Sequence, residues 1–473
     1  MYRKEYLKRV LDRFQNEFYE KEAFSVYDGI HVRRISFGKF RMDILKAAAY
    51  FQSHNIVQEH IALAAENSYE WYVAFFAVLA SGNIAVLINP DLPENEILDQ
   101  CEFAEVSIVF CGKRKWQNKG KMKALNWQEL TERSQMEMKM VYEPDKDALS
   151  CLLFTSGTLG SNKAVMLSAG NLEVCMSDVM DKFHVQRTIL VLPLYHISGI
   201  GGTLYLLANG KCVCIGRGVK YIFQDLPILN PDHMSMVPGI MESFIKILKR
   251  CADSREREKH IGTALKHLGV GGAAAGEESC RYLIKQGFEL GTGYGLSETA
   301  GYGTAGMLTE SRLKSIGKPL SGMQCRIENG EILLSGSALM LGYYKDQEAT
   351  QTAVKNGWLY TGDLGYQDSD GWYYLTGRKK NVIILSNGEN VSPEQLEEIL
   401  SRCEDILECL VYSVPKGICA DIYTKNRPAA AAYIKNYNHS VPTYRQIFRI
   451  NYSDAPLEKT GSGKIKRKEN QYE

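Results

Sequence analysis

An apolar run that opens into a polar loop constrains this chain more than any other stretch of its sequence. The run Leu149–Phe154 precedes the loop Thr155–Lys163, and a second apolar run, Ala164–Leu167, follows it. This order is typical of a strand that enters a loop at its end. Glycines admit close approach of backbone N–H groups, hydroxyls donate hydrogen bonds, and Lys163 adds positive charge, so the loop suits phosphate. Its spacing is not that of the GxxxxGK[ST] motif, and an ordinary surface loop has a similar composition.

Length and charge limit the class of protein. A chain of 473 residues predicts two or three domains, and a formal net charge of +1 gives no electrostatic support for nucleic-acid binding. The start, Met1–Tyr6, lacks the apolar core of a signal peptide. The most apolar segment, Trp71–Ile88, is interrupted by Ser81–Asn83, which leaves no span of about 18 to 20 apolar residues. We therefore expect a cytoplasmic protein with no transmembrane segment and no nucleic-acid partner.

The 12 cysteines are scattered, with no CxxC pair and no histidine cluster beside them. Cys212 and Cys214 alternate in a strand-like run, so both side chains are expected on one face of a sheet. A metal or disulfide role for this pair stays open. For the cysteines as a group we expect buried free thiols in a reducing compartment.

Alternating helical and strand-like patterns up to about residue 145 predict a parallel sheet covered by helices. The pattern predicts helices over Lys39–Phe51 and Glu70–Ala80, and strands over His60–Ala65 and Ile84–Ile88. The segment Gly317–Trp372 is rich in β-formers and glycine turns, which favours a small barrel or distorted sheet. The fold class is therefore α/β, with helix-covered sheets and a barrel-like β subdomain in a large N-terminal domain.

Two further stretches carry residue types suited to ligand binding. His196 follows a predicted strand, Ile189–Leu192, and ligands of open α/β sheets lie at the carboxyl ends of strands. A histidine at such a place also serves often as a hydrogen-bonded structural residue. In a later glycine-rich turn, Tyr294 can stack on a base and Glu298 can hold Mg²⁺ through its hard oxygens.

A rival interpretation is an NAD-type oxidoreductase. Gly269, Gly271 and Ala274 match the GxGxxG/A dinucleotide fingerprint, and acidic Glu289 lies about 20 residues farther on. The motif stands deep in the chain, however, and short glycine patterns often arise without a dinucleotide site.

Further short motifs follow in order along the chain: Tyr360–Asp363, Gly377–Lys380, Gly388–Pro393 and Thr460–Ile465. Together with the loop and the glycine-rich turns, this series resembles the adenylate-forming (AMP-binding) superfamily. That superfamily contains acyl-CoA and aryl-CoA synthetases, peptide-synthetase adenylation domains and firefly luciferase. The resemblance is collinear from about Ile35 to Arg467, and a series of motifs in one order is far more specific than any single one.

The resemblance implies a role for each matching residue. The residues implied to bind ATP are Thr155, Ser156, Gly157, Thr158, Gly160 and Lys163 at the β- and γ-phosphates, Gly272 and Ala273 at the adenine, Tyr294 and Gly295 in the adenine-stacking turn, Ser297 at phosphate, and Asp363 and Arg378 at the ribose. Glu298 is implied as the Mg²⁺ ligand and Lys464 as the lysine that bridges the substrate carboxylate and the α-phosphate. Lys380 matches the hinge between domains 1–379 and 380–473, the latter a small mobile α+β domain, and Gly388 matches the face presented to the thiol.

The implied activity is ATP-dependent activation of a small carboxylic acid through an acyl-adenylate, followed by transfer to a thiol. ATP, Mg²⁺ and CoA are the implied cofactors, because the stretch around His196 is similar to that of CoA synthetases, in which this histidine belongs to the catalytic site. A free-standing adenylation enzyme that loads a carrier-protein phosphopantetheine is the alternative. A non-catalytic AMP-binding regulator is opposed by the retention of Lys464, Glu298 and Asp363.

The chain departs from the family pattern at several positions. Leu159, Asn162 and Ala164 stand where the family usually has Thr, Pro and Gly, and Asn381 replaces an acidic residue after the hinge. The tail passes from Ala429–Ile434 almost directly to Val441, where the family normally places a helical segment, so we expect an abbreviated C-terminal domain.

The three stretches implied to line the acid pocket carry no charged residue. They are His196–Thr203, Met236–Met241 and Gly301–Thr304. Because burying an unpaired second charge is costly, an acid with an uncharged aryl or medium acyl tail is favoured.

Overall fold

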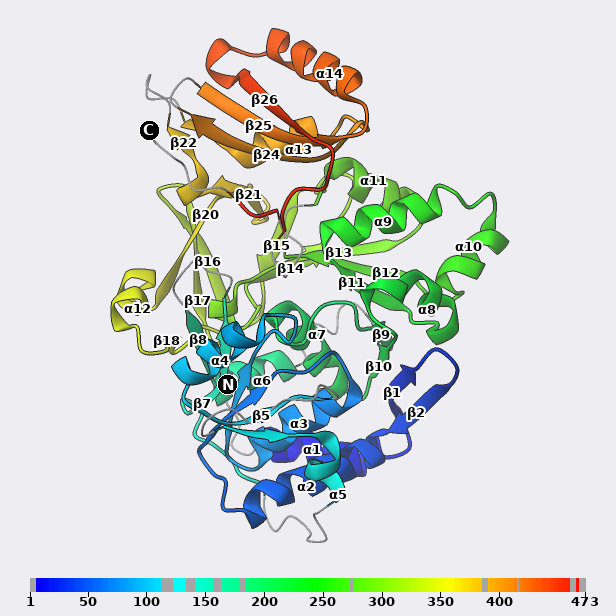
Figure 1. The fold of residues 1–473 in the computed structure, drawn as a ribbon, viewed down its shortest axis with the longest axis vertical. Coiled ribbons are helices and arrows are strands. Elements are labelled where there is room, and N and C mark those ends of the chain that lie inside the picture. Colours follow the sequence, from blue (N-terminus) through cyan, green and yellow to red (C-terminus); the bar gives the residue numbers. More distant parts are fainter. Residues whose placement is uncertain are drawn as a thin grey trace. The chain divides into compact units, whose positions relative to one another are not determined.

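The computed structural model describes residues 6–112, 122–132, 141–155, 163–177, 184–272, 275–384, 390–414, 417–459 and 465–467 (Figure 1). Seven of the predicted site residues lie outside these ranges: Ser156, Gly157, Thr158, Gly160, Ala273, Gly388 and Lys464. Packing divides the chain into a large unit, residues 1–325 and 334–359, and a small unit, residues 326–333 and 360–473. The domain boundary at Lys380 stays a prediction.

The first sheet of the large unit has seven strands in the order β18-β8-β7-β4-β3-β5-β6. Its strands are β3 (His60–Leu63), β4 (Ile84–Leu87), β5 (Val106–Phe110), β6 (Lys123–Leu125), β7 (Leu149–Phe154), β8 (Ala164–Ser168) and β18 (Gly342–Tyr343). The strands from β7 through β6 pair in parallel, whereas β7–β8 and β8–β18 are antiparallel. The predicted parallel sheet and the two early strands are confirmed.

The second sheet of the large unit runs in the order β15-β14-β13-β12-β11-β9-β10-β1-β2. Its strands are β1 (Glu22–Tyr27), β2 (Val32–Ser36), β9 (Arg187–Ile189), β10 (Cys212–Ile215), β11 (His233–Met236), β12 (His267–Gly271), β13 (Glu289–Tyr294), β14 (Thr304–Met307) and β15 (Ser315–Pro319). The strands from β1 to β13 along this path are parallel, which brings their carboxyl ends to one edge.

Helices cover these sheets, as the α/β prediction requires. They are α1 (Tyr6–Asn16), α2 (Phe37–Ser53), α3 (Tyr69–Ala80), α4 (Glu94–Phe103), α5 (Trp127–Glu132), α6 (Ala169–Met176), α7 (Ile197–Ala208), α8 (Ile222–Leu229), α9 (Pro238–Leu248), α10 (Ser254–Ile261), α11 (Glu277–Lys285) and α12 (Gln347–Ala353). Helix α3 is buried on every side, which explains why its sequence is apolar all round. Ser68 starts it by accepting a hydrogen bond from the Trp71 backbone N–H.

The small unit combines strands with two helices. Its strands, three of which extend across the boundary in sequence, are β16 (Met323–Glu328), β17 (Glu331–Gly336), β20 (Trp358–Gln367), β21 (Tyr373–Arg378), β22 (Ile383–Ile384), β23 (Asn390–Val391), β24 (Ile406–Val414), β25 (Gly417–Thr424) and β26 (Ile447–Ser453). Helices α13 (Pro393–Leu400) and α14 (Arg427–Ser440) pack on the β24–β25–β26 sheet, and a cluster of buried aliphatic residues joins them to it (Figure 1).

Helix α14 corrects one expectation from the sequence. The tail was expected to lack a helical segment before Val441, but Arg427–Ser440 forms a helix of 14 residues there. Asn426 caps it, accepting from the Ala429 backbone N–H, and Pro428 occupies its first turn. The alanine run is therefore helical, in keeping with the high helix propensity of alanine, and the expectation of an abbreviated C-terminal domain is wrong.

Two expectations from the composition concern membrane-spanning helices and the state of the cysteines. In that part of the chain, no helix combines the length and apolar character needed to cross a membrane. All 12 cysteines are free thiols, and most are buried, as expected. Burial raises the pKa of Cys280 to about 11, so its thiolate form is scarce at neutral pH.

A row of polar side chains crosses four neighbouring strands of the second sheet. Thr188, His233, His267 and Glu289 stand opposite one another in register on β9, β11, β12 and β13. Thr188 Oγ1 lies 2.8 Å from His233 Nδ1, and His267 Nδ1 lies 3.2 Å from a Glu289 carboxylate oxygen. Burial, reinforced by the neighbouring His267, lowers the pKa of His233 to about 4. His233 is therefore neutral in the folded protein at neutral pH.

We expect His233 to make the protein less stable as the pH falls from 6.5 toward 4. The unfolded chain takes up this proton near pH 6.5, whereas the folded ring resists it until about pH 4. The ring keeps some contact with solvent, so we expect a contribution of about 1 to 3 kcal/mol at the acid end. His233→Gln should flatten the pH dependence of the unfolding free energy measured in urea. His260→Gln, at an exposed position on α10, is the control; equal acid slopes in the wild type and His233→Gln would contradict the prediction.

Candidate functional site

The loop Thr155–Lys163 connects the antiparallel pair β7–β8. The last paired residues of the two strands are Phe154 and Ala164. One step farther, the Thr155 backbone N–H donates to the Lys163 carbonyl at 3.0 Å, and the Thr155 hydroxyl reaches the same oxygen at 3.4 Å. The strand-to-loop prediction is confirmed, and both described ends of the loop are held by the sheet.

His196 stands at the N-terminus of α7, just beyond strand β9. Its Nδ1 lies 2.7 Å from the Ser198 hydroxyl and accepts a hydrogen bond from the Ser198 backbone N–H at 3.2 Å. One ring nitrogen therefore caps the helix. That nitrogen has the hydrogen-bonded structural role that the sequence also allowed for His196. The preceding segment is fixed by Asn67, which donates to the Leu192 carbonyl and accepts from the Leu194 N–H.

The glycine-rich segment at 269–272 does not have the geometry of a dinucleotide fingerprint. In that motif the first glycine makes the turn after a strand, but Gly269 and Gly271 lie within strand β12, opposite Gly291 and Gly293 of β13. Glu289 begins β13 and pairs with Lys266 at 2.5 Å. Gly272 follows the strand with a positive φ of 76°, a backbone conformation that favours glycine.

The turn after β13 contains Tyr294, Gly295, Ser297 and Glu298. Tyr294 ends the strand, and Gly295 follows in a position where a Cβ atom would lie 2.2 Å from the Gly301 carbonyl oxygen. Ser297 and Glu298 begin a single 3-10 turn, Ser297–Thr299. The close backbone approach explains why the sequence needs glycine between the aromatic residue and the carboxylate.

Tyr343 joins two of the predicted ATP-site residues. Its hydroxyl donates to Glu298 Oε1 at 2.7 Å, and the Lys163 ammonium lies 5.1 Å from the centre of its ring. Burial and the adjacent Glu298 carboxylate raise the pKa of Tyr343, so its hydroxyl stays protonated and donating. The large unit thus brings Lys163 and Glu298 to the same side chain, which the sequence analysis did not identify.

The charges of this cluster fit a magnesium–triphosphate group. Within the described ranges, no ion pair neutralises the half-buried Glu298 carboxylate, and none neutralises the Lys163 ammonium. A carboxylate oxygen is a ligand that Mg²⁺ prefers, and a lysine ammonium is a common partner for phosphate oxygens. The donor set therefore suits the predicted ligands.

The predicted ribose-binding residues meet in the small unit. Asp363 and Arg378 are directly opposite on β20 and β21, and Arg378 Nε lies 2.6 Å from Asp363 Oδ1. Asp363 is only 4% exposed. Beside it, the buried Glu331 carboxylate accepts from the Gly362 backbone N–H at 2.9 Å and pairs with Lys379 at 3.0 Å. Asp363 thus lies on a pair of strands that ion pairs and hydrogen bonds hold together.

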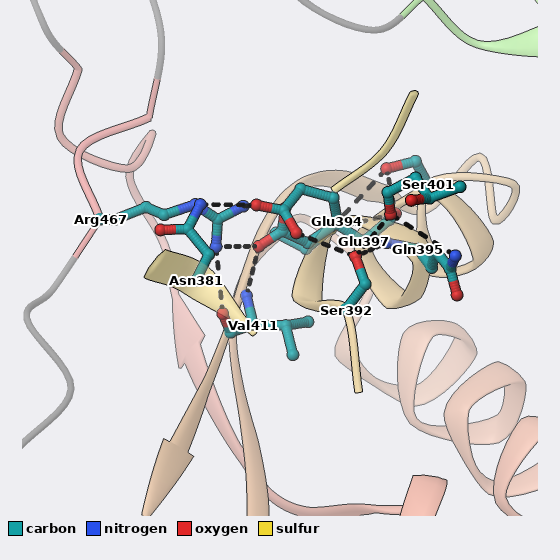
Figure 2. Close-up of polar contacts among 10 residues, drawn as sticks. Asn381, Ser392, Glu394, Gln395, Glu397, Ser401, Val411 and Arg467 are labelled. Atoms are coloured by element: carbon teal, nitrogen blue, oxygen red, sulfur yellow. Dashed lines mark hydrogen bonds and ion pairs between the residues drawn. The ribbon is translucent and has the colours of Figure 1, made fainter. Parts of the chain in front are cut away.

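A polar network on α13 links the residues after the predicted hinge to the chain's tail (Figure 2). Lys380 lies exposed in the 3-10 turn Lys379–Asn381, and Asn381 donates to Glu394 Oε1 at 2.6 Å. Arg467 reaches the same Glu394 oxygen at 3.2 Å and donates to both oxygens of Glu397, at 3.1 and 2.7 Å. The replacement of an acidic residue by Asn381 is thus accommodated by a hydrogen bond to a carboxylate.

Relatives of known activity are similar to this chain over most of its length. A family model for AMP-binding enzyme matches residues 11–344. Long-chain-fatty-acid–CoA ligase of Bacillus subtilis (strain 168) is 26% identical over 479 residues, covering 86% of this chain and 83% of that protein. 2-Succinylbenzoate–CoA ligase of Haemophilus influenzae is 28% identical over 375 residues, covering 78% of this chain and 75% of that protein.

Solved structures share the fold. o-Succinylbenzoate CoA synthetase from Bacillus subtilis, in complex with its acyl-adenylate intermediate, matches with a TM-score of 0.85 at 23% identity, over 98% of this chain and 97% of that one. The same enzyme has been solved with ATP and a magnesium ion. An anthranilate CoA ligase bound to anthranoyl-AMP matches with a TM-score of 0.83 at 18% identity, over 98% of this chain and 96% of that one. With the family model matching most of its length, this chain belongs to the AMP-binding enzymes.

Proposed function

We propose that this protein is an ATP-dependent acid–thiol ligase that forms an acyl-CoA through an acyl-adenylate. In the first step a carboxylate oxygen of the acid bonds to the α-phosphorus of ATP, and the bond to the bridging oxygen breaks to release pyrophosphate. In the second, the sulfur of CoA, having lost its proton, bonds to the acyl carbon, and AMP leaves with the oxygen. The observation that carries the proposal is the Lys163–Tyr343–Glu298 cluster.

The chemistry asks the protein mainly to position reactants and to offset negative charge. A carboxylate is a weak nucleophile that is repelled by a triphosphate, so cationic groups near the reacting oxygens lower the barrier. Lys163 would bind the β- and γ-phosphates, Asp363 the ribose hydroxyls, and Lys464 the carboxylate and α-phosphate. A magnesium ion held by Glu298 would supply further charge neutralisation on the phosphate oxygens.

CoA is the proposed acceptor. The expected abbreviation of the C-terminal domain would have supported a carrier-protein thiol as the alternative acceptor, and helix α14 removes that support. The stretch around His196 remains similar to that of CoA synthetases. The proposed mobile small domain, with a hinge at Lys380, would present Gly388 to the thiol after the first step.

The proposed acid has one carboxylate and an uncharged tail. This rests on the absence of charged residues from the sequence stretches His196–Thr203, Met236–Met241 and Gly301–Thr304. The relatives include ligases named for 2-succinylbenzoate and sulfoacetate, whose substrates carry a second charge. A chain that lacks a cation in those stretches is not expected to share that preference.

An ATP–pyrophosphate exchange assay with a panel of acids tests the proposal directly. Benzoate and octanoate should support exchange better than 2-succinylbenzoate, and exchange should require Mg²⁺. Addition of CoA should then yield a thioester and AMP, whereas a phosphopantetheinylated carrier protein should not. Exchange with no acid of the panel, or thioester formation on the carrier protein alone, would contradict the proposal.

Asp363→Ala is expected to raise the dissociation constant of ATP about 10- to 100-fold, because a carboxylate that accepts hydrogen bonds from two ribose hydroxyls is lost. Calorimetric titration with ATP measures the effect, and the melting temperature reports on the fold. A melting temperature that falls while the affinity for ATP is unchanged would show that Asp363 serves only its strand pair with Arg378.

A further inference from the structure

We infer that Tyr343 is a positioning residue that holds the cation-binding carboxylate Glu298 and the phosphate-binding Lys163 apart and aligned. The inference rests on the proposed function of those two residues. Tyr343 then has two separate tasks, one for its hydroxyl group and one for its ring.

The backbone places Tyr343 beside the phosphate loop. Strand β18 pairs antiparallel with β8, so Tyr343 stands opposite Val165, two residues beyond Lys163. Lys163 directly precedes strand β8, and its ammonium lies over the ring of Tyr343. The observed separation of 5.1 Å from the ring centre is that of a cation–π contact.

The same segment also contacts the turn that carries the carboxylate. The Met340 backbone N–H donates to the Glu298 carbonyl at 2.8 Å, and the Tyr343 hydroxyl donates to Glu298 Oε1 at 2.7 Å. A hydrogen bond to one oxygen fixes the rotamer of a carboxylate and leaves the second oxygen as a ligand for a cation. Tyr343 therefore orients Glu298 without neutralising it.

The backbone of Tyr343 is itself held in place by the segment that follows it. Its backbone N–H donates to the Thr350 hydroxyl at 2.8 Å, and that hydroxyl donates to the Asp346 carbonyl at 2.8 Å. The preceding Gly342 has a φ of 142°, and a Cβ there would meet the Thr350 side chain at 2.8 Å. The tyrosine is thus held in one place by the start of α12.

The ring prevents a competing interaction. Lys163 and Glu298 carry opposite charges and contact the same side chain, yet no ion pair joins them in the described structure. A direct ion pair between them would neutralise the ammonium proposed to bind phosphate. It would also occupy the carboxylate oxygen proposed to bind the cation. With the ammonium over the ring and one carboxylate oxygen on the hydroxyl, both groups remain available for a magnesium–triphosphate ligand.

The two tasks can be separated by two substitutions. Tyr343→Phe removes the hydroxyl but keeps the ring, and Tyr343→Leu removes both. The matched control is Tyr344→Phe, because the neighbouring Tyr344 hydroxyl also donates to a carboxylate, that of Glu105, at 2.6 Å on the surface. Glu298→Gln marks the loss of the cation ligand. Dissociation constants are measured by calorimetry for AMP, for ATP with excess chelator, and for ATP with Mg²⁺.

We expect Tyr343→Phe to reduce the gain in ATP affinity that Mg²⁺ provides by about tenfold, with affinities for AMP and for ATP in chelator unchanged. Tyr343→Leu should in addition weaken ATP in chelator, while AMP, which lacks the β- and γ-phosphates, binds as before. Tyr344→Phe should match the wild type in all three titrations.

A magnesium gain in Tyr343→Phe equal to that of the wild type would overturn the inference. So would an equal loss of AMP and ATP affinity in either variant, because it would indicate a general structural role. If the wild type gains affinity with Mg²⁺ and only Glu298→Gln loses that gain, the proposed function stands and the role of Tyr343 fails. A wild type that does not bind ATP would overturn both.

Discussion

Replacing Lys464 with alanine is expected to slow acyl-adenylate formation by about 10²- to 10³-fold, the usual effect of removing one group that stabilises charge in the transition state. The proposed role of this lysine is to offset the repulsion between the substrate carboxylate and the α-phosphate. Thioester formation from supplied acyl-adenylate should change little, because that repulsion belongs to the first step alone. Pyrophosphate exchange measures the first step, and CoA consumption with synthetic acyl-adenylate measures the second.

Two further variants test whether the effect on the first step is specific to Lys464. Lys466→Ala should leave both half-reactions within about twofold of the wild type, because its ammonium pairs with the exposed Glu458 carboxylate and surface pairs contribute little. Lys380→Pro, which stiffens the proposed hinge, should spare the first step and slow the second. Equal loss of both half-reactions in Lys464→Ala and Lys380→Pro would contradict an alternation of the small domain between the two steps.

Replacing Arg467 with methionine is expected to destabilise the small unit by about 2 to 3 kcal/mol. The Glu397 side chain is 18% exposed, and its two oxygens receive the Arg467 guanidinium and the Val411 backbone N–H. Loss of the guanidinium leaves a largely buried carboxylate without its cation. Removal of one partner of a fully buried pair costs about 3 to 5 kcal/mol, and the residual exposure here lowers that figure.

The pH dependence identifies the cause of this loss. Burial already raises the pKa of Glu397 above its ordinary value of 4.5, and Arg467 opposes that rise. Without Arg467 the folded state would hold the Glu397 proton more tightly than the unfolded state does, so the deficit should grow as the pH rises above 4.5. Urea unfolding at pH 5 and pH 8 measures it. The control is Arg427→Met, whose pair with Asp454 is solvent-exposed and should be worth less than about 1 kcal/mol; equal losses in both variants would contradict the argument.

Local sequence patterns predicted the elements well where a continuous apolar run had the length of one helix or strand. The apolar stretch at 70–80 appears as the fully buried helix α3, and Ile84–Ile88 corresponds to the parallel strand β4. The family was recognisable because its motifs are short, ordered and contiguous. The α14 segment was misjudged because a helix was expected only between Ile434 and Val441, whereas the cap Asn426 and the first-turn Pro428 start the helix before the alanine run.

The contacts that complete the site could not be predicted, because they join distant segments. Tyr343 and Glu298 are 45 residues apart, and Asn67 reaches the Leu192 carbonyl across 125 residues. Asn171, which binds two carbonyls of the segment that leads to Tyr343, does so across 166 and 168 residues. No local period encodes such pairs. The G-Y-Y sequence at 342–344 is the local signal that could have drawn attention to Tyr343.

The partly exposed cysteines of this protein can serve as natural labelling sites on both units. Most of its cysteines are buried, but Cys251, Cys325 and Cys403 are partly exposed, and Cys403 belongs to the small unit while the other two belong to the large one. A maleimide-linked dye or spin label should therefore react first at these positions, without any engineered cysteine. After substitution of Cys325 by serine, energy transfer or dipolar spectroscopy between Cys251 and Cys403 would follow the separation of the two units through each half-reaction.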